Sequence, residues 1–173
     1  NRPLSNILCR IENTLLVTVS DAQGQFVLSN APVGSVRLNV DGRNRGYGGE
    51  WHTLQFDLVT VAGRDNRLDR PIYLLPLDEA NSVLAGGAED VTLHLDGIPG
   101  SSLTVFAHSL RNAAGQPITN RVLWTQVNLE RVPMAPPLGS QFTLAGTVQP
   151  INLRFSPPAR VCLPNNGAPP GQV

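Results

Sequence analysis

The sequence contains no lysine, only two cysteines and few charged residues of either sign. All 13 basic residues are arginine, so neither a Lys–Asn isopeptide cross-link nor lysine-based catalysis can occur. Two cysteines are too few for a disulfide-rich scaffold. Charged residues make up 15% of the chain and the formal net charge is zero. Nucleic acids and anionic membrane surfaces attract proteins with an excess of basic residues. We therefore expect no nucleic-acid partner.

Long apolar runs and helical periodicity are also lacking. No stretch approaches the roughly 20 apolar residues of a membrane-spanning helix, so we expect no membrane insertion. No signal peptide is recognisable, and neither end of the sequence resembles a natural terminus. This favours a part excised from a longer protein.

Apolar and polar residues instead alternate with a period of two, which is typical of strands with one buried face. Turn dipeptides such as Asp41-Gly42 and Asp96-Gly97 separate these segments. Short strands at this spacing predict an all-β fold built from β-sandwiches. The clearest alternating sets are Val36, Leu38 and Val40; Val91, Leu93 and Leu95; and Ile151, Leu153 and Phe155.

The alternation stops over residues 78–90, and a new set of strands follows. A chain of this length can bury one large core or two small ones. We place a domain boundary in this region and predict two tandem β-sandwich domains, residues 1–80 and 81–173.

A turn ending in Gly24, an apolar segment with Phe26 and Leu28, and a Pro32-Val-Gly34 turn precede the alternating strand over residues 36–40. This order resembles the carboxypeptidase regulatory-like domain, a transthyretin-like β-sandwich. The resemblance covers residues 1–77 and implies that the family's first strand would precede Asn1. A sandwich without that strand has an open edge that can recruit a strand from another chain.

The second half of the sequence carries proline-containing turns in a fixed order: Ile98-Pro99-Gly100, Val132-Pro-Met-Ala-Pro-Pro137, Gln149-Pro150 and Phe155-Ser-Pro-Pro158. It resembles the sandwich domain that follows such a module in large secreted bacterial proteins of the Rhs/YD-repeat type. It is also distantly similar to the sandwich domains of ankyrins and netrin receptors. Those domains are interaction and scaffold units, so the resemblance implies a non-catalytic role in an extracellular or cell-surface bacterial protein.

Few residues of the sequence indicate a catalytic or metal-binding site. His52, His94 and His108 lie far apart and lack zinc-binding spacing, so no metal site is predicted from them. His108-Ser109 is the sharpest candidate, because distant relatives of the second domain cleave themselves beside a His and a Ser. Adjacent strand residues point to opposite faces, which disfavours contact between nucleophile and base. We therefore expect a strand-to-turn transition there. No cofactor is expected, although acidic turn residues could assemble a calcium site in space.

Two further pairs leave alternatives open. Tyr47 and Trp51 lie in the Gly-rich segment 42–52 and could stack on a sugar ring, or Trp51 could close the end of its own sandwich. Cys9 and Cys162 each lie in an apolar, strand-like run. We expect buried free thiols, and a disulfide between them is the alternative.

These observations predict a structural or adhesive module without enzyme activity, which is part of a larger extracellular bacterial protein. It would act as a spacer and as a contact surface for other proteins or for other domains of the same chain. One alternative is a subunit that self-associates into a fibre through β-strand complementation. Another is a carbohydrate-binding module.

Overall fold

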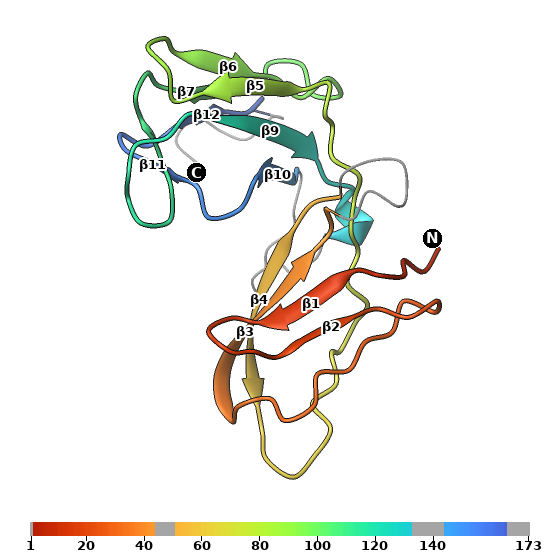
Figure 1. The fold of residues 1–173 in the computed structure, drawn as a ribbon. Coiled ribbons are helices and arrows are strands. Elements are labelled where there is room, and N and C mark those ends of the chain that lie inside the picture. Colours follow the sequence, from red (N-terminus) through yellow and green to blue (C-terminus); the bar gives the residue numbers. More distant parts are fainter. Residues whose placement is uncertain (1, 44–50, 133–143, 166–173) are drawn as a thin grey trace. The chain divides into compact units, whose positions relative to one another are not determined.

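The computed structural model describes residues 2–43, 51–132 and 144–165. They form antiparallel sheets consistent with two β-sandwich-like bodies, so the prediction of an all-β fold is confirmed (Figure 1). The 3-10 turn η2 (Leu129–Arg131) is capped by Asn128, whose side chain accepts a hydrogen bond from the Glu130 N–H. The chain divides into two compact units, Asn1–Leu77 and Asp78–Val173, close to the predicted boundary.

The first unit is built on a four-stranded sheet with the order β2-β1-β3-β4. All three strand pairs are antiparallel. The strands are β1 (Leu8–Ile11), β2 (Val17–Val19), β3 (Gly34–Asp41) and β4 (Leu54–Thr60). A tight turn joins β1 to β2, in which the Thr14 hydroxyl donates to the Ile11 carbonyl at 2.8 Å.

One face of this sheet carries the core of the first unit. Its buried residues are Ile7, Cys9, Ile11, Val36, Leu38 and Val40. Phe26 and Leu28 pack against this core. However, residues 25–28 form no strand. The alternation therefore identified the buried side chains correctly, but it carries no information on whether the backbone pairs with a neighbour.

Over its described residues, 78–132 and 144–165, the second unit contains eight strands in three sheets, with the orders β10-β9-β5, β12-β7-β6 and β11-β8. Its core is Ala85, Leu93, Leu95, Leu103, Val105, Leu110, Val122 and Trp124. The strands are β5 (Ser82–Ala85), β6 (Val91–Leu93), β7 (Ser102–Val105), β8 (Leu110–Arg111), β9 (Asn120–Gln126), β10 (Gly146–Gln149), β11 (Arg154–Phe155) and β12 (Arg160–Cys162).

The strand predicted over residues 151–156 is much shorter in the structure. Asn152 has a φ of 67°, in the left-handed region, and pairing is confined to Arg154 and Phe155 in β11. A strand needs extended backbone, so a residue in the left-handed region interrupts it. The alternation still holds, because Leu153 and Phe155 pack against the core.

Asn81 connects two sheets of the second unit. Its side-chain Nδ2 donates to the carbonyl of His94, just beyond β6, at 2.6 Å. The same nitrogen donates to the carbonyl of Trp124 in β9 at 2.8 Å. One amide group thus satisfies two backbone acceptors from segments far apart in the sequence.

The part of the chain that the structure describes has no helix with the length and hydrophobicity of a membrane crossing.

Candidate functional site

The outer face of the first sheet, opposite the core, exposes three neighbouring apolar side chains. Val19 lies across from Leu8, and Val17 lies across from Arg10 in the β1–β2 ladder. Leu8, Val17 and Val19 are 37%, 58% and 51% exposed, and we call these three residues the apolar strip. Single exposed apolar residues are ordinary, whereas a contiguous group is typical of a contact surface.

The apolar strip lies beside the open edge of β2. The Ile11 N–H donates to the Leu16 carbonyl at 3.1 Å, and the Ser20 N–H donates to the Ile7 carbonyl at 3.0 Å. Hydrogen bonding alternates along an antiparallel ladder, so Thr18 also pairs toward β1 while Val17 and Val19 direct their N–H and C=O groups the other way. Among the described residues, β2 pairs with β1 alone. Exposed apolar side chains and unpaired backbone groups therefore coincide at this edge.

The opposite edge of the sheet, on β4, has a different character. By the same alternation, Gln55, Asp57 and Val59 direct their backbone groups away from β3. Arg37 Nε donates to Asp57 Oδ1 at 2.7 Å across β3 and β4. The hydrogen bond from Arg37 lowers the pKa of the Asp57 carboxyl. A charged residue in an edge strand discourages pairing with another sheet.

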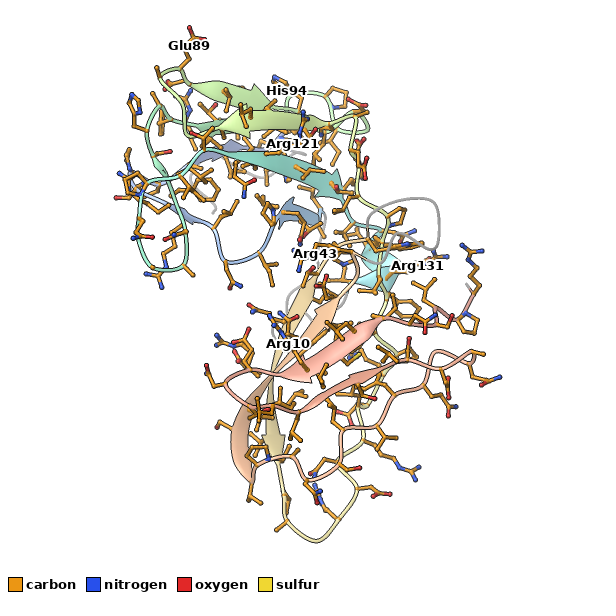
Figure 2. All side chains as sticks on the ribbon, viewed as in Figure 1. Arg10, Arg43, Glu89, His94, Arg121 and Arg131 are labelled. Atoms are coloured by element: carbon orange, nitrogen blue, oxygen red, sulfur yellow. The ribbon has the colours of Figure 1, made fainter. Side chains whose placement is uncertain are left out.

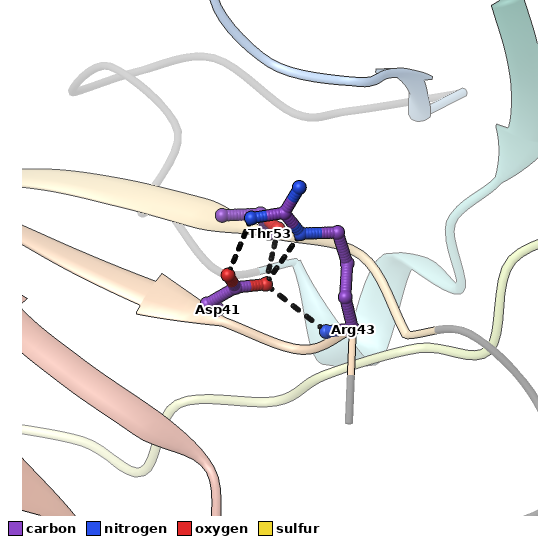
Figure 3. Close-up of polar contacts among 3 residues, drawn as sticks. All are labelled: Asp41, Arg43 and Thr53. Atoms are coloured by element: carbon purple, nitrogen blue, oxygen red, sulfur yellow. Dashed lines mark hydrogen bonds and ion pairs between the residues drawn. The ribbon is translucent and has the colours of Figure 1, made fainter. Parts of the chain in front are cut away.

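A second polar cluster joins the ends of β3 and β4 (Figure 3). Arg43 forms a two-pronged contact with Asp41, with Nε 2.8 Å from Oδ1 and Nη2 2.6 Å from Oδ2. The Thr53 hydroxyl donates to Asp41 Oδ1 at 3.2 Å. These bonds, chiefly the one from the Arg43 side chain, lower the pKa of Asp41 despite its partial burial. Gly42 is required between them, because a Cβ there would lie 2.3 Å from the His52 carbonyl oxygen.

Of the two predicted sugar-stacking residues, Tyr47 lies outside the described residues. Trp51 is half-buried and forms a β-bridge with Pro76 of its own unit. Its indole Nε1 is buried and has no hydrogen-bond partner among the described residues. Sugar stacking and closing the end of the unit both stay predictions for Trp51.

The His52 side chain is buried in the first unit, with 1% of its surface exposed. His52 Nδ1 lies 2.8 Å from the Leu75 backbone nitrogen and 2.9 Å from the Leu75 carbonyl oxygen, so it accepts from the first in one ring tautomer and donates to the second in the other. Nε2 is buried and has no hydrogen-bond partner within the part of the chain that the structure describes. Burial lowers the pKa of His52, and the ring is neutral at pH 7.

His108 and Ser109 lie in the turn between β7 and β8, as predicted. His108 has a φ of 54°, and the fully buried Ser109 hydroxyl donates to the Phe106 carbonyl at 2.7 Å. That hydroxyl is thus engaged with backbone rather than with an imidazole. The pair therefore has the bonding of a structural turn, and not that of a nucleophile and its base.

A shallow pocket of about 360 Å³ lies beside this turn. Arg111 Nη1 donates to the carbonyls of His108 and Leu110, at 2.8 and 3.1 Å, which fixes the guanidinium at the pocket. A fixed guanidinium suits a small anion. The lining residues are Gly86, His108, Arg111, Pro117, Ile118 and Thr119.

Both cysteines have free thiols in the structure. Cys9 is 1% exposed in the core of the first unit, and burial raises the pKa of its thiol to about 11. Cys162 is exposed in β12, at the edge of its sheet. The prediction of burial is therefore right for Cys9 and wrong for Cys162, because an edge strand leaves side chains uncovered even within an apolar run.

Charged side chains are dispersed over both units, as the labelled Arg10, Glu89 and Arg121 illustrate (Figure 2). In the exposed segment after β4, Arg67 Nη2 is 3.8 Å from Asp65 Oδ2. Within residues 2–43, 51–132 and 144–165, no three His, Cys, Asp or Glu side chains gather so that they could hold a metal ion. The calcium alternative stays a prediction.

Comparisons with protein-family models, with curated proteins and with solved structures found no match. The two family resemblances stay predictions. The apolar strip was not predicted from the sequence. The alternation at Val17 and Val19 was a signal for a strand, but it does not tell which face of that strand another layer covers.

Proposed function

We propose that this chain is a non-catalytic structural module of a larger extracellular bacterial protein, and that it makes protein contacts through β2. The observation that carries this proposal is the apolar strip beside an open strand edge. The extracellular and bacterial setting is supported by the two resemblances in the sequence.

The partner at this edge is an extended protein segment. A strand laid along β2 would accept and donate hydrogen bonds at Val17 and Val19, which direct their backbone groups outward. Alternate side chains of that strand would lie beside the apolar strip and pack against Val17 and Val19, which gives the contact both affinity and register. A sugar or a small ion can satisfy only part of this surface, because neither offers a repeating set of backbone donors and acceptors.

The organisation of the chain supports a spacer role as well. Each unit has its own core, and the two cores share no residue. Units built in this way hold their shape through internal packing and present their edges and loops as contact surfaces.

The contact can be tested with a strand-forming peptide of alternating Thr and Val residues. We expect its addition to the ¹⁵N-labelled chain to shift the amide signals of Val17 and Val19 in NMR spectra. The control is the same peptide with its central residue replaced by proline, because proline lacks the N–H that the ladder needs.

Two matched variants locate the contact. Val19→Lys should abolish the shifts, because a charge then interrupts the apolar strip. Val59→Lys places the same charge on the β4 edge, where Val59 is 72% exposed, and should leave them unchanged. Absence of shifts in the original chain, or shifts that persist in Val19→Lys, would contradict the proposal.

A further inference from the structure

We propose that the natural partner of β2 is β2 of a second copy of this chain, paired antiparallel around Thr18 into a closed symmetric dimer. This inference rests on the proposed contact surface and specifies its occupant.

The backbone of β2 is complementary to itself. When Thr18 faces Thr18 of the second copy, Val17 of one chain lies across from Val19 of the other. Val17 and Val19 are the residues whose N–H and C=O groups point outward, so both cross-pairs form hydrogen-bonded pairs. The two four-stranded sheets then continue as one sheet. A shift by one residue would place outward-directed groups opposite inward-directed ones and lose these bonds.

The side chains agree with the same register. Leu8 lies beside Val19 in its own sheet, and Val19 would lie beside Val17 of the second copy. The two apolar strips thus adjoin on the same face of the joined sheet, where Val17 of each chain packs beside Val19 of the other as a cross-strand pair. Arg10 lies across from Val17 on the side away from the partner, so the pairing brings no two arginines opposite each other.

The β4 edge does not offer the same match. Antiparallel self-pairing centred on Asp57 would place it opposite Asp57 of the second copy, and pairing centred on Leu58, the equivalent of the arrangement proposed for β2, would place its carboxylate opposite the apolar Val59. Like charges directly across a ladder are destabilising. Pairing β2 with β4 of the next copy would leave an unpaired edge at each end and would grow into a fibre, whereas β2 with β2 closes after two copies. The edge chemistry therefore favours a dimer over the fibre.

The first test is the molar mass of the intact chain by sedimentation equilibrium. A three-residue strand gives a small interface, so we expect weak association. The molar mass should rise toward twice that of the monomer as the chain concentration approaches about 1 mM. Val19→Lys should weaken association by about tenfold or more, and Val59→Lys should not change it. A constant monomer mass overturns the dimer, and so do masses that grow beyond two chains.

The second test traps the register by oxidation in a Cys9→Ala, Cys162→Ser background, because Cys9 lies directly across from Thr18 in β1 and would otherwise pair with a cysteine placed there. Thr18→Cys should give a covalent dimer, because non-hydrogen-bonded antiparallel pairs bring Cα atoms to about 4.5 Å, within disulfide range. Val59→Cys is the matched control and should stay monomeric. Equal cross-linking of both variants, or none in Thr18→Cys, would overturn the proposed pairing.

The two proposals fail in distinguishable ways. A chain that binds the Thr/Val peptide at Val17 and Val19 but remains monomeric keeps the contact surface and loses the dimer. A chain that does neither loses both.

Discussion

Val19 lies directly across from Leu8 in the β1–β2 ladder, and both side chains remain exposed on the face of the sheet opposite the core. The same ladder places Cys9 opposite Thr18 on the other face, and Cys9 is buried there. A strand with apolar residues on both faces needs cover on both. The first unit covers one face with its own chain and leaves the apolar strip on the other face exposed, beside the open edge of β2.

The apolar strip should therefore contribute to contact and not to the stability of the monomer. We expect the double substitution Val17→Thr with Val19→Thr to change the free energy of unfolding by less than about 0.5 kcal/mol, because both positions are exposed. The same variant should lose the amide shifts caused by the Thr/Val peptide. Urea unfolding of dilute protein measures the first quantity, and a loss above about 2 kcal/mol would show that the valines serve the fold instead.

Asn81 should be among the most sensitive polar residues of the second unit. Asn81→Asp keeps the shape of the side chain but removes the Nδ2 donors that bond to His94 and Trp124. We expect a loss of about 2–3 kcal/mol in the free energy of unfolding, because two carbonyls lose their donor and face a carboxylate. Trp124 fluorescence during urea unfolding, in a Trp51→Phe background, reports on this unit.

Asn112→Asp is the matched control for that experiment. Asn112 Nδ2 donates to Gln116 Oε1 in an exposed turn, and its Oδ1 accepts from the Gln116 N–H, a bond that Asp retains. Its effect should stay within about 0.5 kcal/mol. Equal effects at the two positions would mean that the bridge made by Asn81 has no special role.

The two thiols should differ sharply in reactivity. Cys162 is exposed, whereas Cys9 is buried and has a thiol pKa raised to about 11. Iodoacetamide at about pH 8 should modify Cys162 at least about 100-fold faster than Cys9, since the thiolate is the reactive form. Mass spectrometry should detect one fast-reacting site in the folded chain and two after denaturation. If neither thiol reacts until a reductant is added, the two cysteines are paired.

His52 should make the first unit less stable in mild acid. Burial lowers the pKa of His52 below its ordinary value of 6.5. In the unfolded chain the ring takes up a proton below about pH 6.5, while the folded ring stays neutral. The contribution of the buried neutral ring is thus fully present above that value. It is lost as the pH falls, by up to about 1.4 kcal/mol per pH unit.

The control for His52 is His52→Asn, whose amide oxygen can still accept from the Leu75 N–H but does not titrate. The free energy of unfolding of the variant should fall less between about pH 7.5 and pH 5.5 than that of the original chain. Parallel curves for the two proteins would show that His52 does not set the pH dependence.

The sequence predicts the all-β fold and much of the two cores, because alternation directly reports which side chains face inward. Leu38, Val40 and Leu93 are buried as that pattern predicts. The bridge made by Asn81 could not be predicted, since both of its acceptors are backbone carbonyls, 13 and 43 residues away. The exposure of Val19 could not be predicted either, because it depends on whether another part of the chain packs over that face of the sheet.

The most direct test of the central claim is hydrogen exchange of the β2 amides, followed by NMR as the concentration of the chain is raised. In dilute solution the Val17 and Val19 amides should exchange quickly and Thr18 slowly, because only Thr18 pairs with Cys9. At high concentration Val17 and Val19 should become protected, while Gln55 and Asp57 on the β4 edge should not. Val17 and Val19 amides that exchange at the same rate at every concentration would contradict the account.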